Sequence, residues 1–434
     1  MPSNCQFAAA MKTVLRFAGP FLLGAWLVLG RVVPSPAQSV VMPMTANPVA
    51  SRIAPDADSV SPPAASSLGS VLLNEGPLIQ RGSLAVRPHA DYRAIYAEGL
   101  QAGPGKPVNT FIQSFSPGFL LEFGRDWTLD YIPTWTYYSN SLFHNTFEQA
   151  ANLNVHVPTT WGTVGGAQSY GSSDDMLVET GGQTHQEKYT SLIDATCNLG
   201  NHAQLETSID RSVLNTTTVA GSPGWTASNW VQWTADAWLR YEFSSRLSAS
   251  AGLTVGKADM AVGTDMNFVL PQVKLSWKLG DKITLDAEAG EEIRHFKNKA
   301  SPPLKSPVYT AAAGYQIFPT TKLSLSGSRT VTASYFANEV TRGDGWVAGL
   351  EQRLFQHFYL EASFTEQGTH YLSVGALAPG PRNDRYRSID LRLTTIVLHR
   401  VTFALIFQTG RNSSDLSAYI FRSDQYGVEA GIRF

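Results

Sequence analysis

A strict alternation of apolar and polar residues, beginning near residue 82, constrains the fold of this chain more than any other feature. Side chains of a β-strand point to opposite faces in turn, so this pattern predicts strands with one apolar and one polar face. The clearest example runs from Trp127 to Tyr138. Its apolar face carries Trp127, Leu129, Tyr131, Trp135 and Tyr137, and its polar face carries Thr128, Asp130, Thr134 and Thr136. A soluble β-sandwich would show the same alternation, so the connections must decide between the two architectures.

The connections alternate between short turns and longer polar segments. Short turns are expected at 123–126, 199–201, 243–245, 279–281, 318–320, 355–357 and 398–399. Longer polar connections are expected from Gly171 to Glu187, Asn215 to Asn229, Asn298 to Pro307 and Gly375 to Arg385. This pattern is typical of transmembrane β-barrels, whose turns are short at one end and whose loops are long at the other. We therefore predict an all-β, antiparallel up-and-down barrel of about 18 strands, an even number, beginning near Leu84 to Tyr96 and ending at Gln425 to Phe434.

Composition removes two other classes of protein. Charged residues make up only 16% of the 434 residues, below the roughly 25% of soluble domains. No stretch after residue 40 approaches the 18 to 20 or so apolar residues that a membrane-spanning helix needs, which excludes a helical membrane protein. The formal charge of −2 provides no basic surface for phosphates, so we expect no nucleic-acid partner.

The N-terminus has the organisation of an export signal. Lys12 and Arg16 precede an apolar run from Phe17 to Gly30, and the small residues of Ser35-Pro36-Ala37 offer a cleavage site after Ala37. An uncleaved anchor is the alternative, although Pro20 and several glycines interrupt the run, and Met11 is an alternative start.

Three segments follow from this interpretation. Residues 1–37 are the expected signal peptide, and residues 38–81, rich in Pro, Ser and Ala, are the expected disordered periplasmic leader. Residues 82–434 are the expected barrel, which we place in the bacterial outer membrane. Its expected partners there are the lipid of that membrane and the barrel-assembly machinery.

Polar and charged residues recur on one face of the expected strands. Lys282, Thr284, Asp286 and Glu288 alternate with apolar residues at 283, 285, 287 and 289. In a barrel this polar face lines a wet lumen while the apolar face meets lipid. The lumen-lining candidates are Thr128, Asp130, Gln232, Asp236, Arg240, Lys274, Asp286, Glu288, Arg353 and Glu361. Their mixed signs argue against strong ion selectivity.

One hairpin allows its strand register to be predicted. If Leu279 opposes Ile283 around a three-residue connection, all apolar residues share one face, Ser276 opposes Asp286 and Lys274 opposes Glu288. The competing register has a two-residue turn, sets Leu279 opposite Lys282 and mixes the two faces.

The last ten residues alternate up to a terminal aromatic residue. Tyr426, Val428, Ala430, Ile432 and Phe434 share one face. A run of this kind resembles the C-terminal signal by which barrel-assembly machinery recognises its clients.

Three further segments resemble the putative outer-membrane β-barrel porin family, whose members include uncharacterised and exopolysaccharide-associated proteins. The segments are Val86 to His89, Phe115 to Phe119 leading through Gly124 into Trp127 to Thr134, and Leu177 to Thr184. The resemblance spans residues 84–434 and implies a barrel in the outer membrane. The resemblance implies no particular substrate and identifies no catalytic residue.

Candidates for chemistry are sparse, and we expect neither an enzyme nor a bound cofactor or metal. His156 with Thr159 or Ser169 is the nearest approach to a base and nucleophile, but no acid is placed to orient the histidine. Asp174 and Asp175 with Glu179 lack the ligand order of a calcium loop. Cys197 has no partner if Cys5 is removed with the signal, and we interpret it as a small apolar strand residue.

The sequence is compatible with three functions. The first is a porin-like channel for small polar solutes, or a barrel linked to polysaccharide export. The second is a non-conducting structural or adhesion barrel whose external loops bind a partner. The third is an outer-membrane hydrolase. A wide, open lumen favours the first function, and a lumen filled by loops favours the second.

Overall fold

The computed structural model describes residues 78–218, 229–298, 301–355, 357–374, 381–397 and 400–434. The expected signal peptide and nearly all of the expected leader lie outside these residues. Within the described residues, no helix has both the length and the apolar character needed to cross a membrane.

Strands account for most of the described chain. They are β1 (Ile79–Arg81), β2 (Leu84–Gln101), β3 (Pro107–Phe123), β4 (Trp127–Tyr138), β5 (Thr146–Thr159), β6 (Gly162–Leu177), β7 (Gly182–Asn198), β8 (Ala203–Thr218), β9 (Trp230–Ser244), β10 (Leu247–Met260), β11 (Met266–Leu279), β12 (Ile283–Phe296), β13 (Leu304–Phe318), β14 (Thr321–Ala333), β15 (Glu339–Leu354), β16 (Phe358–Ser373), β17 (Arg382–Val397), β18 (Val401–Ser414) and β19 (Phe421–Arg433). One short 3-10 helix, η2 (Ser417–Tyr419), precedes β19.

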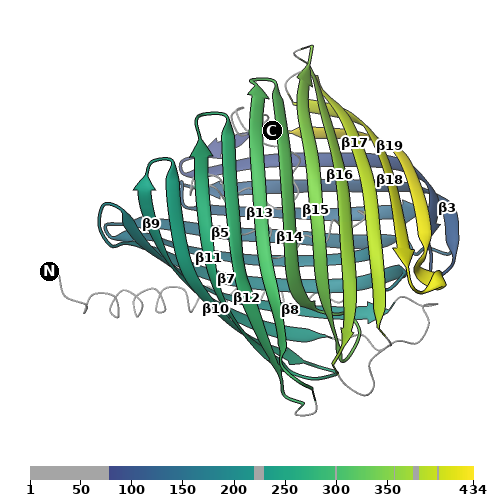
Figure 1. The fold of residues 1–434 in the computed structure, drawn as a ribbon. Coiled ribbons are helices and arrows are strands. Elements are labelled where there is room, and N and C mark those ends of the chain that lie inside the picture. Colours follow the sequence, from purple (N-terminus) through teal and green to yellow (C-terminus); the bar gives the residue numbers. More distant parts are fainter. Residues whose placement is uncertain (1–77, 219–228, 299–300, 356, 375–380, 398–399) are drawn as a thin grey trace. The chain divides into compact units, whose positions relative to one another are not determined.

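The strands β2 to β19 form a closed ring. Each strand pairs antiparallel with the next, and β19 pairs with β2, with Tyr426 opposite Tyr96, to complete the ring. The short strand β1 adds three residues beside the start of β2. In Figure 1 the strands β13 to β19 lie in the front wall, and the strands of the back wall run across them, as the tilt of barrel strands requires. The predicted 18-strand up-and-down barrel is therefore confirmed.

The two ends of the barrel differ in their connections. At the end where β2 begins and β19 ends, called here the terminal end, the connections have two to four residues. At the opposite end, called the loop end, they have four to eleven. The predicted alternation is present, with an additional short turn at Thr160-Trp161, and the turns at 356 and 398–399 lie outside the described residues. Strands also extend into the connections expected at 215–229, 298–307 and 375–385, so these are shorter than expected.

The register predicted for the β11–β12 hairpin is confirmed. Leu279 opposes Ile283, Ser276 opposes Asp286 and Lys274 opposes Glu288. Gly280 adopts a φ of 65°, a left-handed conformation that glycine accepts without strain.

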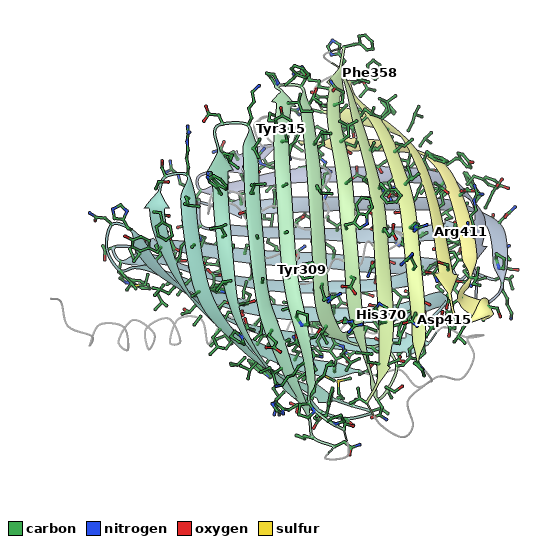
Figure 2. All side chains as sticks on the ribbon, viewed as in Figure 1. Tyr309, Tyr315, Phe358, His370, Arg411 and Asp415 are labelled. Atoms are coloured by element: carbon green, nitrogen blue, oxygen red, sulfur yellow. The ribbon has the colours of Figure 1, made fainter. Side chains whose placement is uncertain are left out.

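Large apolar side chains occupy alternate positions on the outer face of the ring. Leu275 on β11 is 45% exposed, Leu405 on β18 is 59% exposed and Phe115 on β3 is 45% exposed. Tyr309 and Tyr315, six residues apart on β13, share this face, as Figure 2 shows. An apolar outer face on many consecutive strands is unlike the surface of a soluble monomer.

Candidate functional site

The inward face of the ring carries the residues predicted to line a lumen. All ten lie in strands at positions that alternate with the exposed apolar ones: Thr128 and Asp130 on β4, Gln232, Asp236 and Arg240 on β9, Lys274 on β11, Asp286 and Glu288 on β12, Arg353 on β15, and Glu361 on β16. The ladder brings some of them together, since Lys274 opposes Glu288, and Ser250 lies between Arg240 and Lys274. Contact of these residues with a solute stays a prediction.

A cluster of ion pairs joins the strands on either side of the β19–β2 seam. Glu429 on β19 lies 2.8 Å from Nη2 of Arg93 on β2 and 2.5 Å from Nη2 of Arg392 on β17. Arg392 also lies 3.9 Å from Glu361 on β16. Since breaking such a partly buried network would leave charges unpaired, the cluster favours closure of the ring. Of these residues only Glu361 is among the lumen-lining residues predicted from the sequence. The pairing itself leaves no local pattern, because the partners are far apart in the sequence.

A second inward cluster is formed by residues of β2, β3 and β4. His89 opposes Gly118 across the β2–β3 ladder, and Nε2 of His89 lies 4.0 Å from Oδ1 of Asp130. A Cβ atom at residue 118 would lie only 2.3 Å from Nε2 of His89. Glycine at this position therefore makes room for the imidazole on the inner wall.

The β6–β7 hairpin corrects one of the predictions. Gly171 to Glu187 was expected to be a long polar loop, but strands continue to Leu177 and resume at Gly182. Side chains from both faces of this hairpin end are buried, including those of Asp174, Met176, Gln183 and Thr184. Polar side chains led to the expectation of a solvated loop, whereas here they are enclosed by other parts of the barrel.

The end of this hairpin lies against the inner wall. Met176 packs in a buried apolar cluster with Ile95 on β2, Ile112 on β3 and Phe143 of the β4–β5 connection. Ile95 and Ile112 are inward, because their neighbours Tyr96 and Phe111 are 42% and 40% exposed on the outer face. The β6–β7 hairpin is therefore bent into the lumen at the loop end.

The tip of the hairpin, residues 178–181, reaches the opposite wall. Oε1 of Glu179 accepts hydrogen bonds from Oγ of Ser334 at 2.5 Å and from the backbone N–H of Tyr335 at 2.8 Å. Ser334 and Tyr335 belong to the β14–β15 connection, and six strands lie between the two hairpins in one direction round the ring and eight in the other. The contact therefore crosses the mouth of the barrel.

Arg382 at the start of β17 fixes this crossing. Its Nη2 donates to the carbonyl oxygen of Glu179 at 2.9 Å and lies 2.8 Å from Asp384. Its guanidinium also lies over the rings of Tyr371 and Tyr419, at 4.0 and 3.9 Å from their centroids. A guanidinium between two aromatic faces and a carboxylate is strongly oriented.

Burial changes the acidity of Glu179, which lies outside the strands. Loss of solvent raises its pKa to about 7, even though the hydrogen bonds from Ser334 and Tyr335 and the charge of Arg382 favour the ionised form. The contact across the mouth therefore contains a carboxyl group that titrates near neutral pH.

The β14–β15 hairpin narrows the mouth from the other side. Val331 and Val340 pack in a second buried apolar cluster with Ala258 on β10 and Met266 on β11. The guanidinium of Arg294, on the inner face of β12, donates to the carbonyl oxygen of Val331 at 3.1 Å. Two hairpins thus lean inward and meet at Glu179.

The alternative chemical sites are not assembled in the described residues. His156 opposes Gly165, Thr159 is on the other face of β5, and Ser169 is four residues along β6 from Gly165, or about 13 Å. Asp174 lies 3.0 Å from Nδ1 of His185, whereas Glu179 contacts Ser334 and Tyr335. The two carboxylates therefore have separate partners. No group of three or more metal-binding side chains gathers in the part of the chain that the structure describes. Cys197, on β7, is not in a disulfide.

The proposed assembly signal forms the final strand. Tyr426 and Val428 are 50% and 51% exposed on the outer face. Ala430, Ile432 and Phe434 follow at every second position and therefore belong to the same face. The backbone N–H of Phe434 donates to the carbonyl oxygen of Pro88 at 3.1 Å, and the Arg400 guanidinium lies 5.1 Å from the Phe434 ring centroid. Recognition of this strand during assembly stays a prediction.

Comparisons with known proteins give likenesses of structure alone. No known family and no curated protein matches the sequence. Among solved structures, Pseudomonas aeruginosa OccK2 (OpdF) is 12% identical over 83% of this chain and 100% of that chain, with a TM-score of 0.47. Pseudomonas aeruginosa OpdK, solved with vanillate, is 13% identical over 80% and 99%, with a TM-score of 0.43. The copper transporter OprC is 11% identical over 82% of each chain, with a TM-score of 0.46. The barrel architecture of this chain rests on its own strand ladder.

Proposed function

We propose that this chain is an outer-membrane barrel that forms a porin-like channel for small polar solutes. The observation that carries the proposal is the closed ring of 18 strands with exposed apolar side chains outside and polar or charged side chains inside. In lipid, closure satisfies every backbone hydrogen bond, and the apolar face replaces contact with water by contact with acyl chains.

The lumen supports passage of polar solutes rather than of one ion. A ring of this strand number is wide enough to enclose water. Its inner wall carries both signs of charge close together, as in the Arg93, Glu429 and Arg392 cluster, so no single sign dominates there. The two inward hairpins narrow the entrance, which favours small solutes over a polysaccharide chain.

A non-conducting barrel is the second candidate. Glu179 and Arg382 hold the β6–β7 tip against the opposite wall, and this contact would support a mouth that stays shut. In that case the connections at the loop end would serve to bind a partner.

Uptake by proteoliposomes separates the two candidates. The folded full chain should admit neutral sugars at rates that fall steeply from a monosaccharide to a tetrasaccharide, while liposomes with heat-denatured protein admit neither. Folded, inserted protein that admits no solute of any size would contradict the channel and leave the non-conducting barrel.

A further inference from the structure

Three arginines stand side by side on the outer face of β17, β18 and β19. Arg387 opposes Arg411, and Arg411 opposes Arg422, so the three form one row across adjacent strands. They share the outer face with Leu391, Leu405 and Val428, which lie further along the same strands towards the terminal end. Figure 2 shows Arg411 on this face of β18.

Such a row carries a cost in the protein alone. Like charges directly opposite one another destabilise a pair of strands. The side chains of Arg387 and Arg422 are 53% and 71% exposed, and Arg411 is exposed as well. Solvent and neighbouring carboxylates therefore weaken the repulsion between the arginines but leave Arg411 between two like charges. A negatively charged ligand on this face would remove that repulsion.

Acidic residues contact the two outer arginines of the row. Glu366 on β16 lies 3.1 Å from Arg387 and 3.6 Å from Arg385, and Asp424 lies 3.1 Å from Arg422. Glu98 on β2 opposes Asp424 beyond the far end of the row. Among the described residues no carboxylate forms an ion pair with Arg411, which has an arginine on each side.

The row lies at the edge of the apolar outer face. On β17 the next outward residue towards the terminal end is Ile389, two positions from Arg387. On β19 the apolar series begins at Tyr426, four positions from Arg422. At about 3.3 Å per residue these intervals are roughly 7 to 13 Å along the strands, where acyl chains give way to headgroups.

We propose that the arginine row, Arg387, Arg411 and Arg422 with the adjacent Arg385, binds the phosphate groups of lipid headgroups in the external leaflet. The proposal rests on the membrane location proposed above. Guanidinium groups bind phosphate through paired hydrogen bonds that an ammonium group cannot match. Adjacent strands lie about 4.8 Å apart, so three arginines span roughly 10 Å and can contact a headgroup with more than one phosphate.

The test compares lipid binding by the full chain and by matched variants in mild detergent. The probe is lipid A with two phosphates, with phosphatidylcholine as the neutral lipid, and native mass spectrometry counts the bound molecules. The test variant is Arg387→Gln, Arg411→Gln and Arg422→Gln combined. The control is Arg211→Gln, since Arg211 is an outward arginine of β8 lying 5.6 Å from the Trp233 ring centroid.

We expect the triple variant to bind lipid A about tenfold more weakly or worse, with the Arg211 control and phosphatidylcholine binding unchanged. Equal lipid A binding by the wild type and the triple variant would overturn the proposal. Displacement of lipid A by inorganic phosphate at equal phosphate concentration would also overturn it, since the site would then recognise a free anion. Heat-modifiable migration of each variant shows that its barrel has folded. A wild-type chain that fails to insert into lipid at all would contradict the proposed function instead.

Discussion

The β11–β12 and β6–β7 hairpins are built from the same kind of strand pair but occupy different surroundings. In β11–β12 every apolar residue from Val273 to Leu279 faces outward, and the register follows from that pattern. In β6–β7 both faces become buried beyond Ser172, and polar side chains pack against other parts of the barrel. In the proposed membrane, the contrast between lipid and lumen determines the register of the first hairpin. The second is governed by contacts that cross the mouth.

This difference shows what each region can tolerate. A wall strand must keep one face apolar but can vary the other, whereas the bent hairpin end must satisfy its polar groups individually because they are shielded from water.

A charge on the lipid face of β11 should be far more harmful than one on the lumen face. Leu275→Arg places a guanidinium in the apolar band, and we expect it to lower the free energy of unfolding by about 2 to 4 kcal/mol. Ser276→Arg is the matched control, because residue 276 points into the wet lumen, and its effect should be small. Denaturant titration in lipid vesicles measures both variants. Equal losses would show that the two faces have been assigned wrongly.

The contact at Glu179 should depend on pH. Its pKa is raised to about 7 when the tip is docked, against an ordinary value of 4.5, so the docked state holds its proton more firmly. Docking is then strongest below pH 4.5 and weakens as pH rises through 7, by roughly 3 kcal/mol in total. We expect hydrogen exchange of the amides from Thr180 to Thr184 to speed up between pH 5 and pH 8, beyond the intrinsic effect of pH on exchange.

Glu179→Gln is the matched variant for this prediction. Both hydrogen bonds from Ser334 and Tyr335 reach the same oxygen, Oε1, so an amide oxygen can accept them without a titrating proton. The variant should keep the tip docked and lose the excess pH dependence. Unchanged pH dependence would assign the titration to another group.

The smallest expected effect concerns Lys274 and Glu288, which oppose each other in the wall. In a wet lumen their attraction is worth only about 0 to 1 kcal/mol, so Glu288→Gln should barely change stability. Their positions can be tested more sharply than their energy. Lys274→Cys should form a disulfide with Glu288→Cys and not with Ala287→Cys, and the reverse result would refute the register in the membrane.

The wall could be predicted from the sequence because its causes are local. Period-two alternation, the three-residue connection at Gly280 and the parity of the strands together gave the ring and the β11–β12 register. The mouth could not be predicted in this way. Arg382 and Glu179 are 203 positions apart, and no local pattern records their contact. The segment from Leu177 to Thr184 forms the tip, and nothing in its own residues indicates its place inside the barrel.

Single-channel conductance measures whether the β6–β7 hairpin narrows the mouth of the proposed transmembrane channel. The measurement compares the wild type with a variant in which residues 174–184 are replaced by a short Gly-Ser turn, in the same bilayer and salt. We expect a small conductance for the wild type and a several-fold larger one for the variant, because ionic current rises with the open cross-section. Two folded, inserted proteins with equal conductance, or with none, would contradict this expectation.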